Sequence, residues 1–148
     1  MNEFDNTPHS IAYYMDNEFK KGFKQLSNEE IDQRIDAVIK LFCCLNGRDM
    51  FMTAYTNLLA MRLLNRTSVN NEAEEKMVKQ LQIECGHNTV SKIKTMFQDM
   101  IKSQQVMNDY KGVQAPSQIE FQVEILTSGH WPYQESLICK IPPQMQRV

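Results

Sequence analysis

Residues 27–45 read SNEEIDQRIDAVIKLFCCL and show a pronounced helical pattern. Its apolar side chains recur at helical spacing, at Ile31, Ile35, Val38, Ile39, Phe42 and Leu45. Ser27 and Glu30 form a Ser-x-x-Glu capping box, in which the hydroxyl and the carboxylate each serve a free amide at the helix start. The stretch therefore predicts an amphipathic helix with a defined beginning. We expect Gly47 to end it, because glycine adopts the left-handed conformation at little cost.

Similar apolar stripes lie on both sides of this helix. They predict helices at about residues 9–21, 48–65, 72–85 and 90–110, with Asn88 or Thr89 capping the last helix and Gly86 stopping the one before it. Short connections favour antiparallel packing. We expect these residues to be buried: Ile35, Phe42, Tyr55, Leu59, Leu63, Leu81, Ile93 and Phe97. Tyr14 and Ile101 are expected on inward faces as well.

The pattern changes near the C-terminus. Apolar and polar residues alternate over residues 119–125, which is typical of a strand. Ile119, Phe121, Val123 and Ile125 are predicted to share the face that packs on the helices, with Glu120, Gln122 and Glu124 on the opposite face. Trp131 follows a turn and is expected to cover the end of the core. A second short strand is predicted at residues 137–141, ended by a Pro-Pro pair.

These patterns predict a mainly α chain, a bundle of four to five helices followed by one or two β-strands. Residues 1–8 are expected to be a disordered N-terminus and residues 9–110 the helical bundle. Residues 111–118 contain Gly and Pro and are expected to be a linker, and residues 119–148 the start of an α/β portion. Strands this few leave a backbone edge unpaired, so we expect self-association of the isolated chain or binding of a partner strand.

The composition narrows the class of function. The net charge of −2 does not indicate nucleic-acid or membrane binding. No apolar run approaches the roughly 18 residues of a membrane span, and the N-terminus lacks the pattern of a signal peptide. The four cysteines have no disulfide-framework spacing, which favours the cytoplasm or nucleus. The ten methionines are interpreted as core residues, with a Met-lined binding groove as the alternative.

The sequence contains no recognisable catalytic, cofactor or metal-binding pattern. Cys85 and His87 would supply a thiol and an imidazole, but a zinc site needs about four ligands at suitable spacing. Glu72, Glu74 and Glu75 could supply an acid/base pair, but their position favours a solvated first helical turn that the helix dipole stabilises. We therefore expect no catalytic residues, no cofactor and no metal.

Six short motifs in order resemble the cullin family, the scaffold subunits of multi-subunit RING ubiquitin ligases. Residues 47–51 with Tyr55 resemble the family's G-K-D-V-F…Y, and residues 59–64 resemble L-A-K-R-L-L. The remaining motifs are E…M…L…E-C-G over residues 74–86, S-K-L-x-x-M-F-x-D-M over residues 91–100, L-T-x-G-x-W-P over residues 126–132, and L-P-P over residues 141–143. Met61 departs from the family pattern, which has a basic residue there, as do Thr89 and Val90.

The resemblance implies a fragment or truncated chain from the C-terminal half of a cullin, comprising its four-helix bundle and the start of its α/β portion. It implies a non-catalytic scaffold that helps to dock the RING-finger subunit by strand addition, with the ubiquitin-conjugating enzyme as an indirect partner. Phe121, Val123, Ile125 and Trp131 are the expected partner-binding residues. The alternatives are a free-standing helical module that competes for cullin partners, and a small enzyme using Cys85 and His87.

Overall fold

The computed structural model describes residues 6–113 and 122–133. Five α-helices follow one another, joined by short connections: α1 (Thr7–Lys20), α2 (Asn28–Cys43), α3 (Arg48–Asn65), α4 (Asn71–Cys85) and α5 (His87–Val113). A short 3-10 helix, η2 (Gly22–Gln25), lies between α1 and α2. The described residues contain no β-strand. The prediction of a mainly helical chain is confirmed.

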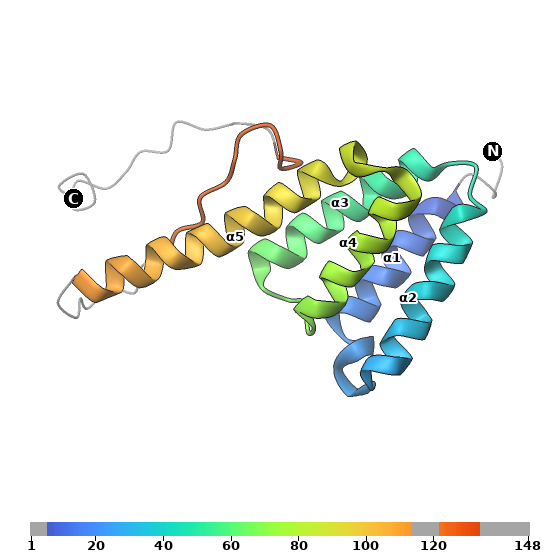
Figure 1. Ribbon diagram of the computed structural model, residues 1–148, viewed down its shortest axis with the longest axis horizontal. Helices are drawn as coiled ribbons and strands as arrows, with labels where there is room; N and C mark the ends of the chain where they lie inside the picture. Colours follow the sequence, from blue (N-terminus) through green and yellow to red (C-terminus); the bar gives the residue numbers. More distant parts are fainter. Residues whose placement is uncertain (1–5, 114–121, 134–148) are drawn as a thin grey trace.

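The helices pack as a bundle from which α5 projects (Figure 1). The most extensive contact joins α1 to α3, and α4 packs between α2 and α5. The C-terminal half of α5 extends beyond the other helices, and residues 122–133 return along it towards the bundle. None of the helices in the described ranges is long and apolar enough to cross a membrane.

Local sequence signals explain most helix ends. The capping box at Ser27 and Glu30 is present: the Glu30 amide donates to Ser27 Oγ, and the Ser27 amide donates to the Glu30 carboxylate at 2.9 Å. Asn70 caps α4 by accepting from the Ala73 amide at 3.0 Å. Gly86 has φ +82° and is the only residue between α4 and α5, so a glycine is needed at this junction.

Two predicted helix boundaries are wrong. Gly47 has φ −109° and precedes α3, whereas α2 ends at Cys43 and is capped by Cys44, which is not left-handed. The start of α5 lies at His87, ahead of the predicted caps at Asn88 and Thr89, because Gly86 already breaks the chain direction. A left-handed residue is found at the end of α3 instead, where Arg66 caps the helix with φ 52°.

The core agrees with the predicted apolar stripes. Six of the eight predicted core residues are buried, and Leu63 and Phe97 are partly buried against the same cluster. Tyr14 is 48% exposed and Ile101 is 58% exposed, so both predictions were wrong. Tyr14 directly precedes buried Met15, and Ile101 directly follows half-buried Met100. Adjacent helical residues differ by about 100° in direction, which turns these two side chains towards solvent.

The predicted segment boundaries and strands differ from the structure where it describes them. Helix α1 begins at Thr7, inside the predicted disordered N-terminus, and α5 continues to Val113, inside the predicted linker. Residues 122–127 form no strand, so the predicted strand is not confirmed there. Residues 119–121 and the predicted second strand at 137–141 lie outside the described residues.

The predicted facing of residues 123–125 is also wrong. Val123 is 37% exposed and Ile125 is 49% exposed, while the side chain of Glu124 is only 15% exposed. The reason is that this part of the chain meets the bundle through its backbone and through Glu124, and not through an apolar face. Side chains of α5, and not a neighbouring strand, receive the backbone hydrogen bonds of this part of the chain.

Candidate protein-docking site

Residues 122–133, called the docking segment below, are held on α5 by two buried polar side chains. Asp99 is 3% exposed and Ser103 is 1% exposed. The Ile125 amide donates to Ser103 Oγ at 2.7 Å, and the Ser103 hydroxyl donates back to the Ile125 carbonyl at 3.4 Å. Asp99 accepts from the amide and the hydroxyl of Thr127, both at 2.7 Å. The docking segment is therefore attached through main-chain groups.

The spacing of these contacts explains why an extended chain fits a helix here. Asp99 and Ser103 are four residues apart on α5, which corresponds to a rise of about 6 Å. Thr127 and Ile125 are two residues apart, which spans about 6.6 to 6.8 Å in an extended chain. The two distances match, and the pairing runs antiparallel to α5. About one helical turn beyond Ser103 on the same face lies Met107, whose thioether is a weak acceptor for an amide.

Asp99 also fixes the far end of the docking segment. The Trp131 indole Nε1–H donates to Asp99 Oδ2 at 2.8 Å, and Trp131 is 7% exposed as part of the core cluster. Burial on its own would raise the pKa of Asp99, but the hydrogen bonds donated by Thr127 and Trp131 outweigh it and lower that pKa below its ordinary value. The ionised carboxylate is therefore the form that holds the segment.

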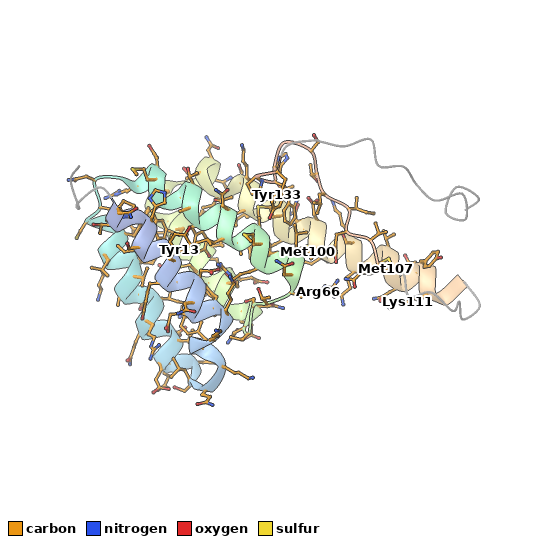
Figure 2. All side chains as sticks on the ribbon, turned by 180° about the vertical axis from the view of Figure 1, so that it is seen from behind. Tyr13, Arg66, Met100, Met107, Lys111 and Tyr133 are labelled. Atoms are coloured by element: carbon orange, nitrogen blue, oxygen red, sulfur yellow. The ribbon has the colours of Figure 1, made fainter. Side chains whose placement is uncertain are left out.

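Helix α3 supplies a third attachment. Arg66 Nη2 donates to Glu124 Oε1 at 2.9 Å, and Gln122 Nε2 donates to the same oxygen at 3.1 Å. Arg66 lies at the end of α3, and Figure 2 shows it close to Met100 of α5, with which it lines one groove. The same view places Met107 and Lys111 further out on the projecting part of α5. The docking segment is thus tied to both α5 and α3.

A buried ionic cluster inside the bundle joins three helices. Arg62 of α3 donates to Glu74 of α4 from Nε at 2.7 Å and from Nη2 at 3.0 Å, and to Asp16 of α1 from Nη1 at 2.7 Å. Arg62 and Glu74 are both 0% exposed. The interpretation of Glu74 as part of a solvated turn was wrong, because Arg62 provides the partner that a buried carboxylate requires.

Aromatic rings surround the guanidinium of this cluster. The Phe19 ring centroid lies 4.8 Å from Arg62 Cζ, and the Tyr55 centroid lies 5.6 Å from it. Burial would lower the pKa of Arg62, but the hydrogen bonds and charge of Glu74 raise it above its ordinary value. The pKa of Tyr55 is also raised, first by burial and then by the negative charge of Glu74. The cluster keeps its charges and fixes α1, α3 and α4 relative to one another.

The four predicted partner-binding residues differ in their exposure to solvent. Val123 and Ile125 are exposed on the docking segment, together with Leu126 at 38%. Trp131 is buried and anchors the docking segment through Asp99, so its side chain is not part of the exposed surface. Phe121 lies outside the described residues. Sequence reasoning missed the anchors Asp99 and Ser103, although Asp99 stands in the motif over residues 91–100 and could have been matched with the Thr and Trp of the later motif.

Cys43 and Cys85 do not show the features of an activated nucleophile. Cys43 Sγ donates to Glu84 Oε2 at 3.1 Å, which raises the pKa of Cys43 together with its burial. Burial also raises the pKa of Cys85, and Arg48 only partly offsets this. A reactive cysteine has a lowered pKa. Within residues 6–113 and 122–133, no three His, Cys, Asp or Glu side chains are grouped so that they could hold a metal ion.

Comparison with known proteins identifies the family. Residues 1–107 match the Cullin family model, whose description is the cullin alpha solenoid domain. The chain belongs to the cullin family. It is 35% identical over 143 residues to Cullin-3 of Dictyostelium discoideum, which covers 94% of this chain and 19% of that protein. It is 35% identical over 142 residues to Cullin-4A of Mus musculus, covering 93% of this chain and 19% of the relative.

This cullin chain spans about a fifth of the length of these two relatives. The matched family model describes an alpha solenoid, whereas the sequence motifs were interpreted as the four-helix bundle that follows the helical repeats.

Proposed function

We propose that this chain is a non-catalytic scaffold segment of a cullin-type E3 ubiquitin ligase, and that its docking segment helps to bind the RING-finger subunit. The observation that supports this is the docking segment itself. In a chain of the cullin family, an extended stretch is held on a rigid helix and presents exposed Val123, Ile125 and Leu126. Exposed apolar side chains beside unpaired backbone groups favour the addition of a partner strand.

The rest of the structure suits a scaffold. A scaffold has to hold its partners at a fixed separation, which requires helices that do not move against one another. The buried cluster of Arg62, Asp16 and Glu74 links three helices, and the connection between α4 and α5 consists of Gly86 alone. The raised pKa values of Cys43 and Cys85 support a chain without a nucleophile of its own. Catalysis would then belong to the ubiquitin-conjugating enzyme that the RING-finger subunit recruits.

Binding to a synthetic peptide from the N-terminal strand of the RING-finger subunit tests the proposal. Calorimetry with the full chain should detect the complex, and Ile125→Asp should weaken it at least about tenfold, because a charge replaces an apolar contact. Tyr13→Asp is the matched control. Tyr13 is 60% exposed on α1, away from the docking segment in Figure 2, and its replacement should leave binding unchanged.

Two outcomes would contradict the proposal. Absence of binding at any accessible concentration would remove the docking role, and equal loss from both variants would show that the contact is non-specific. The non-catalytic part is tested separately. The purified chain should form no thioester with ubiquitin when mixed with activating and conjugating enzymes, and a thioester at Cys85 would overturn that part.

A further inference from the structure

The connection between α2 and α3 contains the only Asn-Gly pair of the sequence, Asn46 and Gly47. It consists of residues 44–47, and Figure 1 shows it at the end of the bundle where α1 begins. Asn46 is exposed. A Cβ atom at position 47 would lie only 3.1 Å from Pro8 Cγ of α1. The close approach of Pro8 therefore favours a glycine directly after Asn46.

The Asn46 side chain and the Gly47 amide are not held by other groups in the part of the chain that the structure describes. Within residues 6–113 and 122–133, no hydrogen bond involves either of them. The Gly47 carbonyl, in contrast, accepts from the Phe51 amide at 3.2 Å at the start of α3. Because glycine has no Cβ atom and a wide range of backbone angles, its amide nitrogen can approach the side-chain carbonyl of the preceding residue. Asparagine is also a thermolabile residue type.

We propose that Asn46 and Gly47 form a site of spontaneous modification, at which asparagine becomes isoaspartate. The Gly47 nitrogen loses its proton and bonds to Asn46 Cγ, and the side-chain nitrogen leaves as ammonia. Water then opens the resulting cyclic imide. Opening at the main-chain carbonyl breaks the original peptide bond, so the backbone continues through the side chain and gains a methylene group. The α-carboxylate released in this way is a methyl acceptor for an isoaspartyl methyltransferase that uses S-adenosylmethionine.

The added methylene lies where α2 and α3 are held together. The ring centroids of Phe42 on α2 and Phe51 on α3 lie 5.0 Å apart. Arg48 Nη2 also donates to the Cys43 carbonyl across the connection. A longer backbone changes the separation of these helix ends, and a closely packed interior does not absorb such a change without loss of contact. We therefore expect the hydrogen bond from the Phe51 amide to the Gly47 carbonyl to weaken.

Peptide mapping by mass spectrometry, on the folded chain incubated at mildly alkaline pH, tests the site. Asn46 should be converted at least about tenfold faster than Asn57, because an amide inside a helix must first give up its hydrogen bond. Asn57 is a matched control, since it is also exposed but lies within α3. The methyltransferase should transfer labelled methyl groups from S-adenosylmethionine to position 46. Asn46→Gln should abolish this labelling, because the longer side chain forms the ring poorly. Conversion of Asn46 no faster than that of Asn57 would overturn the proposal.

Amide hydrogen exchange separates the effect of the altered backbone from that of the added charge. The Phe51 amide should exchange at least about threefold faster in the isoaspartyl chain than in the parent chain, because its hydrogen bond is weakened. Asn46→Asp carries the same charge on an unchanged backbone and should leave this exchange rate as in the parent chain. Equal rates in the isoaspartyl chain and in Asn46→Asp would show that the connection accommodates the methylene, and would overturn the effect proposed for α2 and α3.

Discussion

Replacement of Arg62 by methionine is the sharpest test of the bundle. Arg62 is 0% exposed and makes two hydrogen bonds to Glu74 and one to Asp16. Methionine fills a similar volume, so the main loss is electrostatic. Asp16 keeps Lys20, which lies 2.7 Å away, but buried Glu74 keeps only the distant hydroxyl of Tyr55 at 3.5 Å. The substitution therefore leaves one carboxylate buried without a cation.

Removal of one partner from a buried ion pair costs about 3 to 5 kcal/mol. A domain of this size has a free energy of unfolding of about 5 to 15 kcal/mol, so Arg62→Met should remove a large fraction of it. The midpoint of thermal unfolding should fall by roughly 10 °C. Urea denaturation followed by helical circular dichroism would measure the loss, provided that the slope of the transition is unchanged.

Two further variants identify the cause. Arg62→Met combined with Glu74→Leu removes both charges and should recover most of the stability, because replacement of a whole buried pair by apolar residues is often close to neutral. Lys79→Met disrupts an exposed pair, in which Lys79 and Glu75 are 3.8 Å apart, and should cost at most about 1 kcal/mol. If Arg62→Met lowers the free energy of unfolding no more than Lys79→Met does, the buried cluster does not hold the three helices together.

Three other predictions follow from single contacts. Ser27→Ala should lower the free energy of unfolding by about 1 kcal/mol, measured by urea denaturation, because α2 loses its cap. The pKa of Asp99 is lowered in the folded chain, so its contribution to stability is complete above the unfolded value of about 4 and is lost as the pH falls through the folded pKa. Trp131 fluorescence should therefore change in acid, and the change should move to higher pH or vanish in Asp99→Asn. The raised pKa values of Cys43 and Cys85 should make both thiols slower to alkylate at pH 8 than a free cysteine, as followed by mass spectrometry, and rapid labelling of either would contradict the hydrogen bond and burial assigned to them.

The helices could be predicted because their signals are local. The capping box at Ser27 and the apolar period of α2 lie within a few residues of the structure that they determine. The same holds for Gly86, whose position between two stripes marks a break. Gly47 shows the limit of this reasoning, since the conformation of a glycine beside a helix end depends on how the next helix is placed.

The buried cluster could not be predicted because its members look like surface residues in sequence. Glu74 stands among other acidic residues at a helix start, where solvation is the ordinary outcome, and Arg62 is 12 residues away. Nothing local distinguishes Glu74 from Glu72, which is exposed. Only the tertiary placement of Glu74 beside Arg62 turns one of these carboxylates inward, and that placement is not encoded within a single turn of helix.

The strand predicted at residues 119–125 is not confirmed where the structure describes it, and its backbone contacts are made with α5 instead. Alternation of apolar and polar residues predicts an extended chain, but it does not reveal whether a strand or a helix will receive the backbone hydrogen bonds. That choice depends on Asp99, which precedes Thr127 by 28 residues. Polar side chains at helical spacing on α5 were available to replace a neighbouring strand, and the apolar side chains of the segment were consequently left exposed.

Helix α3 connects the two polar features of the molecule. Arg62 is buried in the core, and Arg66, one turn later, binds Glu124 of the docking segment. The turn between them is closed by the Thr67 amide, which donates to the Arg62 carbonyl at 3.0 Å. The docking segment is thus held by α5 through Asp99 and Ser103 and by α3 through Arg66, and α3 is in turn fixed to α1 and α4. A partner strand that binds at Leu126 would be attached to the whole bundle and not to a mobile loop, which is the property that a scaffold requires.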